Sequence, residues 1–483
     1  MPENLCDLDA TDLARLIAQK QVSPVEVMRA HLERIATVNS RINAILTLAP
    51  AAEGEARRAE AAVLRGETIG PLHGVPFTVK DSLDTAGVRT TRGSQLFADH
   101  VPATDATAVA RLKRAGAVLL AKTNVPEFSF ARETANLLVG RTVNPWNPER
   151  TPGGSSGGEA AAIAARLSPL GLGSDVAVSI RGPAHYCGIV GLKATHGRIP
   201  LTGHWPETLR RFWHVGPMAR SVRDTALALT ILAGPDGRDG YAMPFPPPVI
   251  HDGGTGSTGP RVGWLAKEGF GPVADEVADT VARAAEALAS LGVEVEETRI
   301  PGLLMCDGNA LTATLFRPEA GSYFADIVRG RAEALHPVMQ RFLDTPVPTL
   351  GEYMAALRDL ERLRDDIAAY FSHHDVLLCP VSPVAAFPHD ARELVVGEVT
   401  LPARHVVRPT APFNVTGSPA LSVPFGWSKD GLPIGIQLVG RHGDEATLLR
   451  LGMALERFHD RRRPLLSSSE RFGAGGPEPG SRS

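Results

Sequence analysis

Short apolar runs that alternate with helical segments constrain this fold more than any other feature of the sequence. Residues 75–79 and 117–121 have the composition of β-strands, and residues 106–115 between them have helical character. The same order returns later, where residues 261–265, 274–291 and 293–296 predict a strand, a helix and a strand. This order favours an α/β fold, with a mixed or parallel sheet covered by helices on both faces.

The composition is that of a globular protein with a sizeable core. Of the 483 residues, 43% are hydrophobic, and a chain this long can bury a core without disulfides or metals. Fibrous, disordered and disulfide-scaffold classes are therefore excluded. The 50 Lys and Arg residues nearly balance the 53 Asp and Glu residues, for a net charge of −3. That balance argues against a nucleic-acid binder, which needs a concentrated basic surface.

The first 65 residues are expected to be helical. Ser23, Pro24 and Glu26 have the spacing of a helix start, with the serine as cap and the glutamate three residues after it. The acidic N-terminus lacks a secretory pattern, and no apolar run approaches the roughly 18 residues of a membrane span. We therefore expect a cytoplasmic protein without a membrane anchor.

Neither the cysteines nor the histidines are spaced as metal ligands. The four cysteines lie far apart in the sequence, whereas zinc ligands come in pairs two to four residues apart. The histidines at positions 185, 196, 204 and 214 have no helical i, i+4 pairing. We therefore predict no metal site and interpret the cysteines as isolated buried thiols.

Residues 151–159, Thr-Pro-Gly-Gly-Ser-Ser-Gly-Gly-Glu, form the most unusual segment and lead into an alanine-rich helix. A glycine-rich turn at a helix start presents free N–H groups, and its two serines suit nucleophilic or proton-relay chemistry. The segment fits the Gly-x-Ser-x-Gly pattern of α/β-hydrolases, but residues 144–150, with two prolines, stand where that motif requires a strand. A phosphate-binding P-loop is excluded because the chain contains no Gly-Lys dipeptide.

Two further segments complete a pattern around this turn. Residues 70–81 place Lys80 at the end of an apolar strand, and residues 173–183 place Ser179 24 positions after Ser155. Together these segments resemble the amidase signature family of serine hydrolases. The similarity extends to residues 122–128, 144–148, 187–193, 216–222, 413–424 and 435–440. Coincidence does not explain so many segments in the same order.

The resemblance implies the amidase-signature fold, a large twisted mixed sheet covered by helices on both faces, and a Ser-Ser-Lys machinery. It assigns Ser179 as the nucleophile, Ser155 as the bridging serine after a cis Gly154–Ser155 bond, and Lys80 as the base. A lysine accepts a proton only when neutral, and an apolar setting favours the neutral amine by lowering its pKa. Ser155 then accepts the proton of Ser179 and passes its own to Lys80, because a serine hydroxyl attacks poorly unless a partner takes its proton.

Two departures from the family lie beside the nucleophile. Members typically have Gly-Gly before this serine, whereas this chain has Ala177 and Val178. The backbone N–H groups of Val176, Ala177 and Val178 still offer an oxyanion hole, provided that neither new residue needs a positive φ, which would strain it. We therefore expect an active enzyme with a reshaped loop. Gly182 stands where the glutamine-using amidotransferases of the family typically carry a longer polar residue, which argues against that role.

We divide the chain into an N-terminal helical segment (1–65) packing on the core, an amidase catalytic domain (66–470) and a disordered tail (471–483). Near the site, Ser156 is expected to cap a helix or hydrogen-bond locally. Asp175 and Arg181 are expected to form a structural ion pair beneath the nucleophile turn. The stretch 311–342 is expected to be a helical cover, with Phe316, Tyr323 and Phe324 facing the site.

The expected reaction is hydrolysis of a carboxylic amide through an acyl-enzyme, without a cofactor. Carbamates, esters and anilides are alternative substrates of the same triad. A catalytically impaired member, with a binding or amidotransferase-type role, is the alternative from another class. Candidates for lining the substrate site are Trp205, Trp213 and Phe316, although core packing explains the tryptophans equally well. The expected partners are a small amide or carbamate and, in a homodimer, a second copy; neither nucleic acid nor a membrane is expected.

Overall fold

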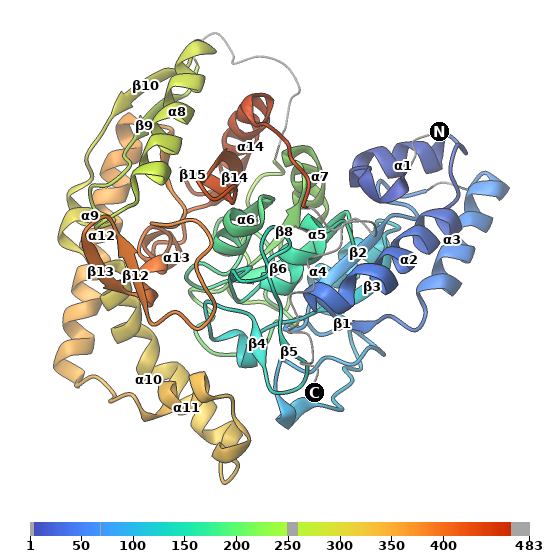
Figure 1. Ribbon diagram of the computed structural model, residues 1–483, viewed down its shortest axis with the longest axis horizontal. Coiled ribbons are helices and arrows are strands. Elements are labelled where there is room, and N and C mark those ends of the chain that lie inside the picture. The colour runs from blue at the N-terminus through green and yellow to red at the C-terminus, as the bar shows by residue number, and fades with distance from the viewer. Residues whose placement is uncertain (1–3, 68, 249–258, 465–483) are drawn as a thin grey trace, which may run out of the picture.

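Eleven strands form one mixed sheet through the middle of the molecule (Figure 1). The computed structural model describes residues 4–67, 69–248 and 259–464. In spatial order, the strands of the sheet are β1 (Ile45–Leu48), β3 (Val118–Thr123), β2 (Pro76–Lys80), β6 (Leu170–Asp175), β8 (His214–Ala219), β7 (Val190–Lys193), β14 (Ala420–Trp427), β15 (Pro433–Gly440), β11 (Val376–Pro380), β9 (Arg261–Trp264) and β10 (Glu294–Glu297).

The pairing of β2 with β6 positions the site. These two strands run parallel, with Thr78 opposite Gly171 and Val79 opposite Leu172. Their carboxyl ends therefore lie at the same edge of the sheet, where Lys80 and Asp175 are the last residues of their strands. Ligand sites of open α/β sheets favour this edge.

Helices cover the central strands. Every residue of β2, β3, β6, β7, β8, β11 and β15 is buried, as expected for strands covered on both faces. One contacting pair over the sheet is α5 (Gly157–Ala164) with α6 (Arg181–Cys187), and another is α7 (Val222–Leu232) with α14 (Glu445–Leu455). The predicted α/β fold with a large mixed sheet is confirmed.

The remaining elements lie around the sheet. The helices are α1 (Ala10–Ala18), α2 (Pro24–Ile42), α3 (Ala52–Arg65), α4 (Thr107–Arg114), α8 (Asp275–Ser290), α9 (Pro301–Met305), α10 (Gly308–Val328), α11 (Pro337–Asp344), α12 (Leu350–His373) and α13 (Ala411–Val415). Two small hairpins pair β4 (Ala135–Asn136) with β5 (Gly140–Arg141), and β12 (Glu393–Val396) with β13 (Val399–Pro402). The predicted helices at 106–115 and 274–291 correspond to α4 and α8.

The N-terminal segment is mainly helical, but residues 45–48 form a strand. The predicted start of α2 is confirmed, because Ser23 Oγ accepts from Val25 N at 2.9 Å and Ser23 N donates to Glu26 Oε2 at 2.8 Å. After α2 ends at the left-handed Asn43, however, Ile45–Leu48 pairs antiparallel with β3 and forms the edge of the large sheet. The expectation of helix throughout 1–65 was wrong here, since a short β-type run beside an open sheet edge gains backbone hydrogen bonds as a strand.

The predicted cover over 311–342 corresponds to α10 and α11, which extend beyond the sheet at the lower left of Figure 1. No helix in the described ranges has the length and apolar character needed to cross a membrane. The predicted tail 471–483 lies outside the described residues.

Candidate active site

Lys80 is completely buried at the end of β2. Its Nζ lies 2.6 Å from Ser155 Oγ, and it also donates to Ser174 Oγ at 3.0 Å and to the Ser174 carbonyl at 3.2 Å. A neutral amine has two N–H donors and one lone pair. Donation to both Ser174 oxygens leaves the lone pair of a neutral Lys80 amine for the Ser155 hydroxyl, whereas the ammonium form donates to all three oxygens. Ser174 was not predicted from the sequence, although it lies one residue before Asp175 on β6.

Burial shifts the protonation of this amine. Removal from water lowers the pKa of Lys80 to about 7, against the opposing charges of Asp175 and Glu159, which favour the ammonium form. Trp213 contributes to the apolar surroundings, because its ring centroid lies 6.0 Å from Lys80 Nζ. Lys80 is therefore poised to exchange a proton near neutral pH.

The glycine-rich segment is a packed turn and not a linker. The Gly154–Ser155 peptide bond is cis, as expected. A Cβ on Gly154 would lie 2.7 Å from Ala131 O, and one on Gly158 would lie 2.3 Å from Asn124 O. Glycine is needed at both positions because neighbouring backbone approaches closely.

Ser156 hydrogen-bonds locally, as predicted. It precedes α5, but its side chain makes no cap hydrogen bond. Its Oγ donates instead to the Ser174 carbonyl at 3.2 Å. Its backbone N–H donates to the Ser179 carbonyl at 3.1 Å. Ser156 therefore ties together the two segments that carry Ser155 and Ser179.

Ser179 lies in the turn between β6 and α6, with 5% of its surface exposed. Ala177 and Val178 are not among the described residues with positive φ. The side chains that replace Gly-Gly therefore cause no left-handed strain. None of the hydrogen bonds found across residues 4–67, 69–248 and 259–464 has the backbone N–H of Ala177, Val178 or Ser179 as donor. These N–H groups therefore have no protein acceptor among the described residues.

A buried network holds the nucleophile turn. Arg181 donates to Asp175 through Nε and a terminal nitrogen, both at 3.1 Å, and both side chains are fully buried. The same guanidinium donates to Gln437 Oε1 at 2.8 Å and to Asn414 Oδ1. Burial opposes ionisation of Asp175, but the charge and hydrogen bonds of Arg181 outweigh it and lower the carboxyl pKa to about 2. The predicted ion pair beneath the turn is confirmed.

A cavity of about 530 Å³ opens onto Ser179. Val176, Ala177 and Val178 line it beside the serine, and Phe316 of α10 lines it from the cover. Tyr323 and Phe324, which were expected to face the site, are not among its lining residues. They point instead into an aromatic cluster with Trp205, because α10 turns their side chains toward the core.

Trp205 and Trp213 do not line this cavity either. Trp205 packs on Phe128, with ring centroids 5.0 Å apart, and Trp213 packs on His204 at 4.7 Å. Both tryptophans are buried, so core packing accounts for them. The presence of tryptophans in this part of the sequence could not distinguish a role in lining the substrate site from a role in core packing.

Four arginines of this cavity were not predicted from the sequence. Arg132, Arg317, Arg341 and Arg404 line it together with Ser179. Arg132 lies in the loop after residues 127–129, Arg317 in α10 and Arg341 in α11. Arg404 lies in the segment that follows β13. No spacing in the sequence connects them, because only the tertiary fold brings them together.

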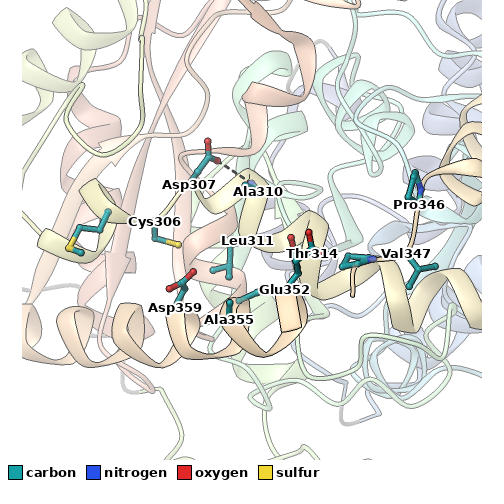
Figure 2. A pocket seen from close by; sticks show the side chains of 13 residues that line it. Cys306, Asp307, Ala310, Leu311, Thr314, Pro346, Val347, Glu352, Ala355 and Asp359 are labelled. Atoms are coloured by element: carbon teal, nitrogen blue, oxygen red, sulfur yellow. Dashed lines mark hydrogen bonds between the residues drawn. The ribbon is translucent and has the colours of Figure 1, made fainter. Parts of the chain in front are cut away.

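A second hollow, of about 470 Å³, lies between α9, α10 and α12 (Figure 2). Cys306, Asp307, Leu311 and Asp359 are among the side chains around it, and none of Lys80, Ser155 and Ser179 contributes. Within the described part of the chain, no three His, Cys, Asp or Glu side chains are grouped as a metal site.

Comparisons with known proteins place this chain in a family. Residues 26–449 match the family model for amidases. The chain is 39% identical to the A-type subunit of the glutamyl-tRNA(Gln) amidotransferase of Moorella thermoacetica, covering 95% of this chain and 98% of that protein. It is 38% identical to the corresponding protein of a Roseiflexus species, covering 94% and 97%.

Solved structures of other proteins are also similar to this chain over nearly its whole length. A chain from a study of a vestigial protein complex and the origins of an s-triazine catabolic enzyme has a TM-score of 0.87 and 32% identity, covering 93% of this chain and 98% of that one. A 6-aminohexanoate cyclic dimer hydrolase has a TM-score of 0.83 and 30% identity, covering 96% and 99%. The chain therefore belongs to the amidase family.

Proposed function

We propose that this protein hydrolyses carboxylic amides through an acyl-enzyme on Ser179, with Ser155 as proton bridge and Lys80 as base. The observation that carries the proposal is the 2.6 Å contact between the buried Lys80 amine and Ser155 Oγ, at a cavity that Ser179 lines. A base so close to a serine, with its pKa lowered to about 7, suits general base catalysis at neutral pH.

The proposed steps use this arrangement and require Ser179 Oγ to approach Ser155 Oγ, a contact that is not among the hydrogen bonds between described residues. Ser179 Oγ attacks the amide carbonyl, its proton passes to Ser155 Oγ, and the Ser155 proton passes to neutral Lys80. The negative charge that develops on the carbonyl oxygen is stabilised by the free N–H groups of the nucleophile turn. As the C–N bond breaks, the proton returns through Ser155 to the leaving amine. Water then attacks the ester by the same route and releases the acid.

The same steps can cleave carbamates, esters and anilides, because all of them present a carbonyl to the nucleophile. The cytoplasmic setting, a small-molecule substrate and the homodimer stay predictions. A panel of amide, anilide, ester and carbamate substrates that share one acyl group separates the reaction classes. We expect the amide to have the highest kcat/KM relative to its uncatalysed rate.

An amidotransferase-type role within a complex is the second candidate, because the curated relatives at 39% and 38% identity carry that name. In that case the ammonia released at Ser179 would be passed on inside a complex with partner chains. Gly182 argues against this role, as does the valine at position 178 that fills the space beside it. Glutamine hydrolysis that appears only when partner proteins are added would favour the second candidate.

Labelling with a fluorophosphonate tests the enzyme against the alternative of a protein that only binds. We expect the wild-type protein to be labelled and the Ser179→Ala variant to remain unlabelled. Ser156→Ala is a matched control, because Ser156 is a buried serine in the same turn and should leave the labelling in place. Absence of labelling in the wild-type protein, with the fold intact, would contradict the proposal.

A further inference from the structure

The cavity at Ser179 has a strongly one-sided charge. Four arginines line it, and none of its lining residues is an aspartate or a glutamate. Clustered guanidinium groups repel one another, so such a cavity favours an anionic occupant. An arginine is available to a ligand only where protein groups do not already hold its guanidinium.

Arg317 is committed to the protein. Its Nε donates to the Thr345 carbonyl at 2.7 Å, and a terminal nitrogen donates to the Leu343 carbonyl at 2.8 Å. These bonds tie α10 to the segment at the end of α11. Arg317 therefore holds the cover in place and is not a ligand for the substrate.

The other three arginines have few protein partners. Arg132 donates only to the Ala391 carbonyl, at 3.4 Å, and its Nε is buried without a partner in the described structure. The side chains of Arg341 and Arg404 take part in none of the hydrogen bonds or ion pairs between described residues. Burial lowers the pKa of Arg132. The positive charges of Arg341 and Arg404 lower this pKa further, and the negative charge of Glu133 raises it. None of these three cations forms an ion pair with a carboxylate among the described residues, although the charge of Glu133 acts on Arg132.

Their position links two hollows. Arg132, Arg341 and Arg404 also line an adjoining cavity of about 720 Å³, so they stand where it meets the cavity of Ser179. The adjoining cavity is also lined by Arg392 and by two carboxylates, Glu133 and Asp390, so arginines outnumber carboxylates there as well. Asp390 pairs with Arg141, and Glu133 accepts from Asp390 N at 3.2 Å.

We propose that the substrate carries a carboxylate in addition to the scissile amide, and that Arg132, Arg341 and Arg404 bind this carboxylate. The inference rests on the proposed function for the bond that is cleaved. Guanidinium groups bind carboxylates through paired, charge-assisted hydrogen bonds. A small molecule fits better than a nucleic acid, because the arginines line concave cavities in a chain whose net charge is −3.

Matched substrates test this charge selection. Glutaric acid monoamide and its methyl ester have the same chain and scissile amide but differ in charge. We expect the wild-type enzyme to favour the acid over the ester by about tenfold to hundredfold in kcat/KM for amide cleavage, the usual effect of a hydrogen-bonded charge. Arg341→Gln and Arg404→Gln should each bring this ratio toward one, and Arg→Lys should restore part of it. The ratio does not depend on how much variant protein is folded.

Arg299→Gln is the control, because Arg299 is an exposed arginine that pairs with Glu268 outside both cavities. It should leave the ratio unchanged. A wild-type ratio near one, or a ratio that neither cavity variant changes, would overturn the proposal.

A binding measurement separates this inference from the proposed function. By calorimetry, the Ser179→Ala variant should bind glutarate, and adding Arg341→Gln should weaken binding at least about tenfold. Glutarate binding by a protein that cleaves no amide would support the carboxylate site and contradict the proposed function. Equal cleavage of charged and neutral amides, without glutarate binding, would do the reverse. Inhibition by RNA but not by glutarate would overturn the carboxylate site.

Discussion

Val178 fills the space that a side chain at position 182 would need. A Cβ on Gly182 would lie 2.6 Å from Val178 Cγ2, and Gly182 N donates to the Val178 carbonyl at 2.7 Å. The two departures from the family pattern are thus one structural change, in which the larger residue before the nucleophile requires the smaller one after it.

This relationship predicts a compensating pair of substitutions. Gly182→Ala should destabilise the protein by about 1–3 kcal/mol, as overpacking of a buried site does. Val178→Ala removes the methyl group that would clash, so the double variant should be more stable than the sum of the single effects indicates. Urea unfolding of the four proteins measures this coupling. Simple additivity would show that the two side chains do not compete for space.

The pKa of Lys80 predicts the acid limb of the activity profile. Because burial lowers this pKa to about 7, the amine is neutral above that pH and protonated below it. We expect kcat/KM to rise by about tenfold per pH unit on the acid side and to level off above about pH 7. Initial rates across pH, with stability followed in parallel, provide the measurement. A limb near the ordinary lysine value would place the amine in water and contradict the mechanism.

Alanine substitutions at the adjacent residues Ser155 and Ser156 should have different effects on activity and stability. Ser155 contacts Lys80, whereas Ser156 contacts the Ser174 carbonyl. Ser155→Ala should lower kcat by about 10³-fold or more, since units of a catalytic triad act together. Ser156→Ala should mainly lower stability, through one lost hydrogen bond worth about 1 kcal/mol. Single-turnover kinetics and unfolding curves distinguish the two roles, and equal losses of activity would not support a bridging role for Ser155.

Substitutions at Phe316 and Trp205 distinguish a residue that lines the cavity at Ser179 from one that only packs in the core. Phe316→Ala enlarges the cavity and should shift the preference toward longer acyl groups. Trp205→Phe changes a buried aromatic contact with Phe128 and should lower stability without moving the chain-length profile. Rates with a homologous series of amides check both expectations. A shifted chain-length profile in Trp205→Phe would indicate that Trp205 contacts the substrate.

Loss of the Asp175 charge should be costly. Asp175→Asn leaves Arg181 fully buried without a counter-charge, which typically destabilises a protein by about 3–5 kcal/mol. Glu268→Gln is a control in an exposed pair with Arg299 and should lower stability far less, because solvent screens that pair. Thermal unfolding compares the two, and a similar small loss in both would mean that Asp175 is not needed beneath the turn.

Much of the fold could be predicted from the sequence, as could the Lys80–Ser155 contact of the candidate site. The strand and helix periods at residues 75–121 and 261–296 are local properties, so β2, α4, β3, β9, α8 and β10 lie within about two residues of their predicted bounds. Lys80, Ser155 and Ser179 were assigned from the resemblance of their flanking segments to the family, and the structure brings Lys80 and Ser155 into contact.

The rest depends on contacts between distant segments. The strand at residues 45–48 forms because β3 offers it an edge, which no local pattern reveals. Arg132, Arg341 and Arg404 approach one another only in three dimensions, across more than half of the chain. The orientation of Trp205 likewise follows from its partners in the core and not from its neighbours in sequence.

The proposed catalytic residues and most of the cavity walls opposite them come from separate stretches of chain. Lys80, Ser155 and Ser179 lie between β2 and α6, whereas α10, α11 and the residues after β13 supply most of the opposing surface. Substitutions in α10, α11 or the residues after β13 can therefore alter which substrates the protein accepts. The segments that carry Lys80, Ser155 and Ser179 can stay unchanged, because a buried ion pair and a packed turn hold them.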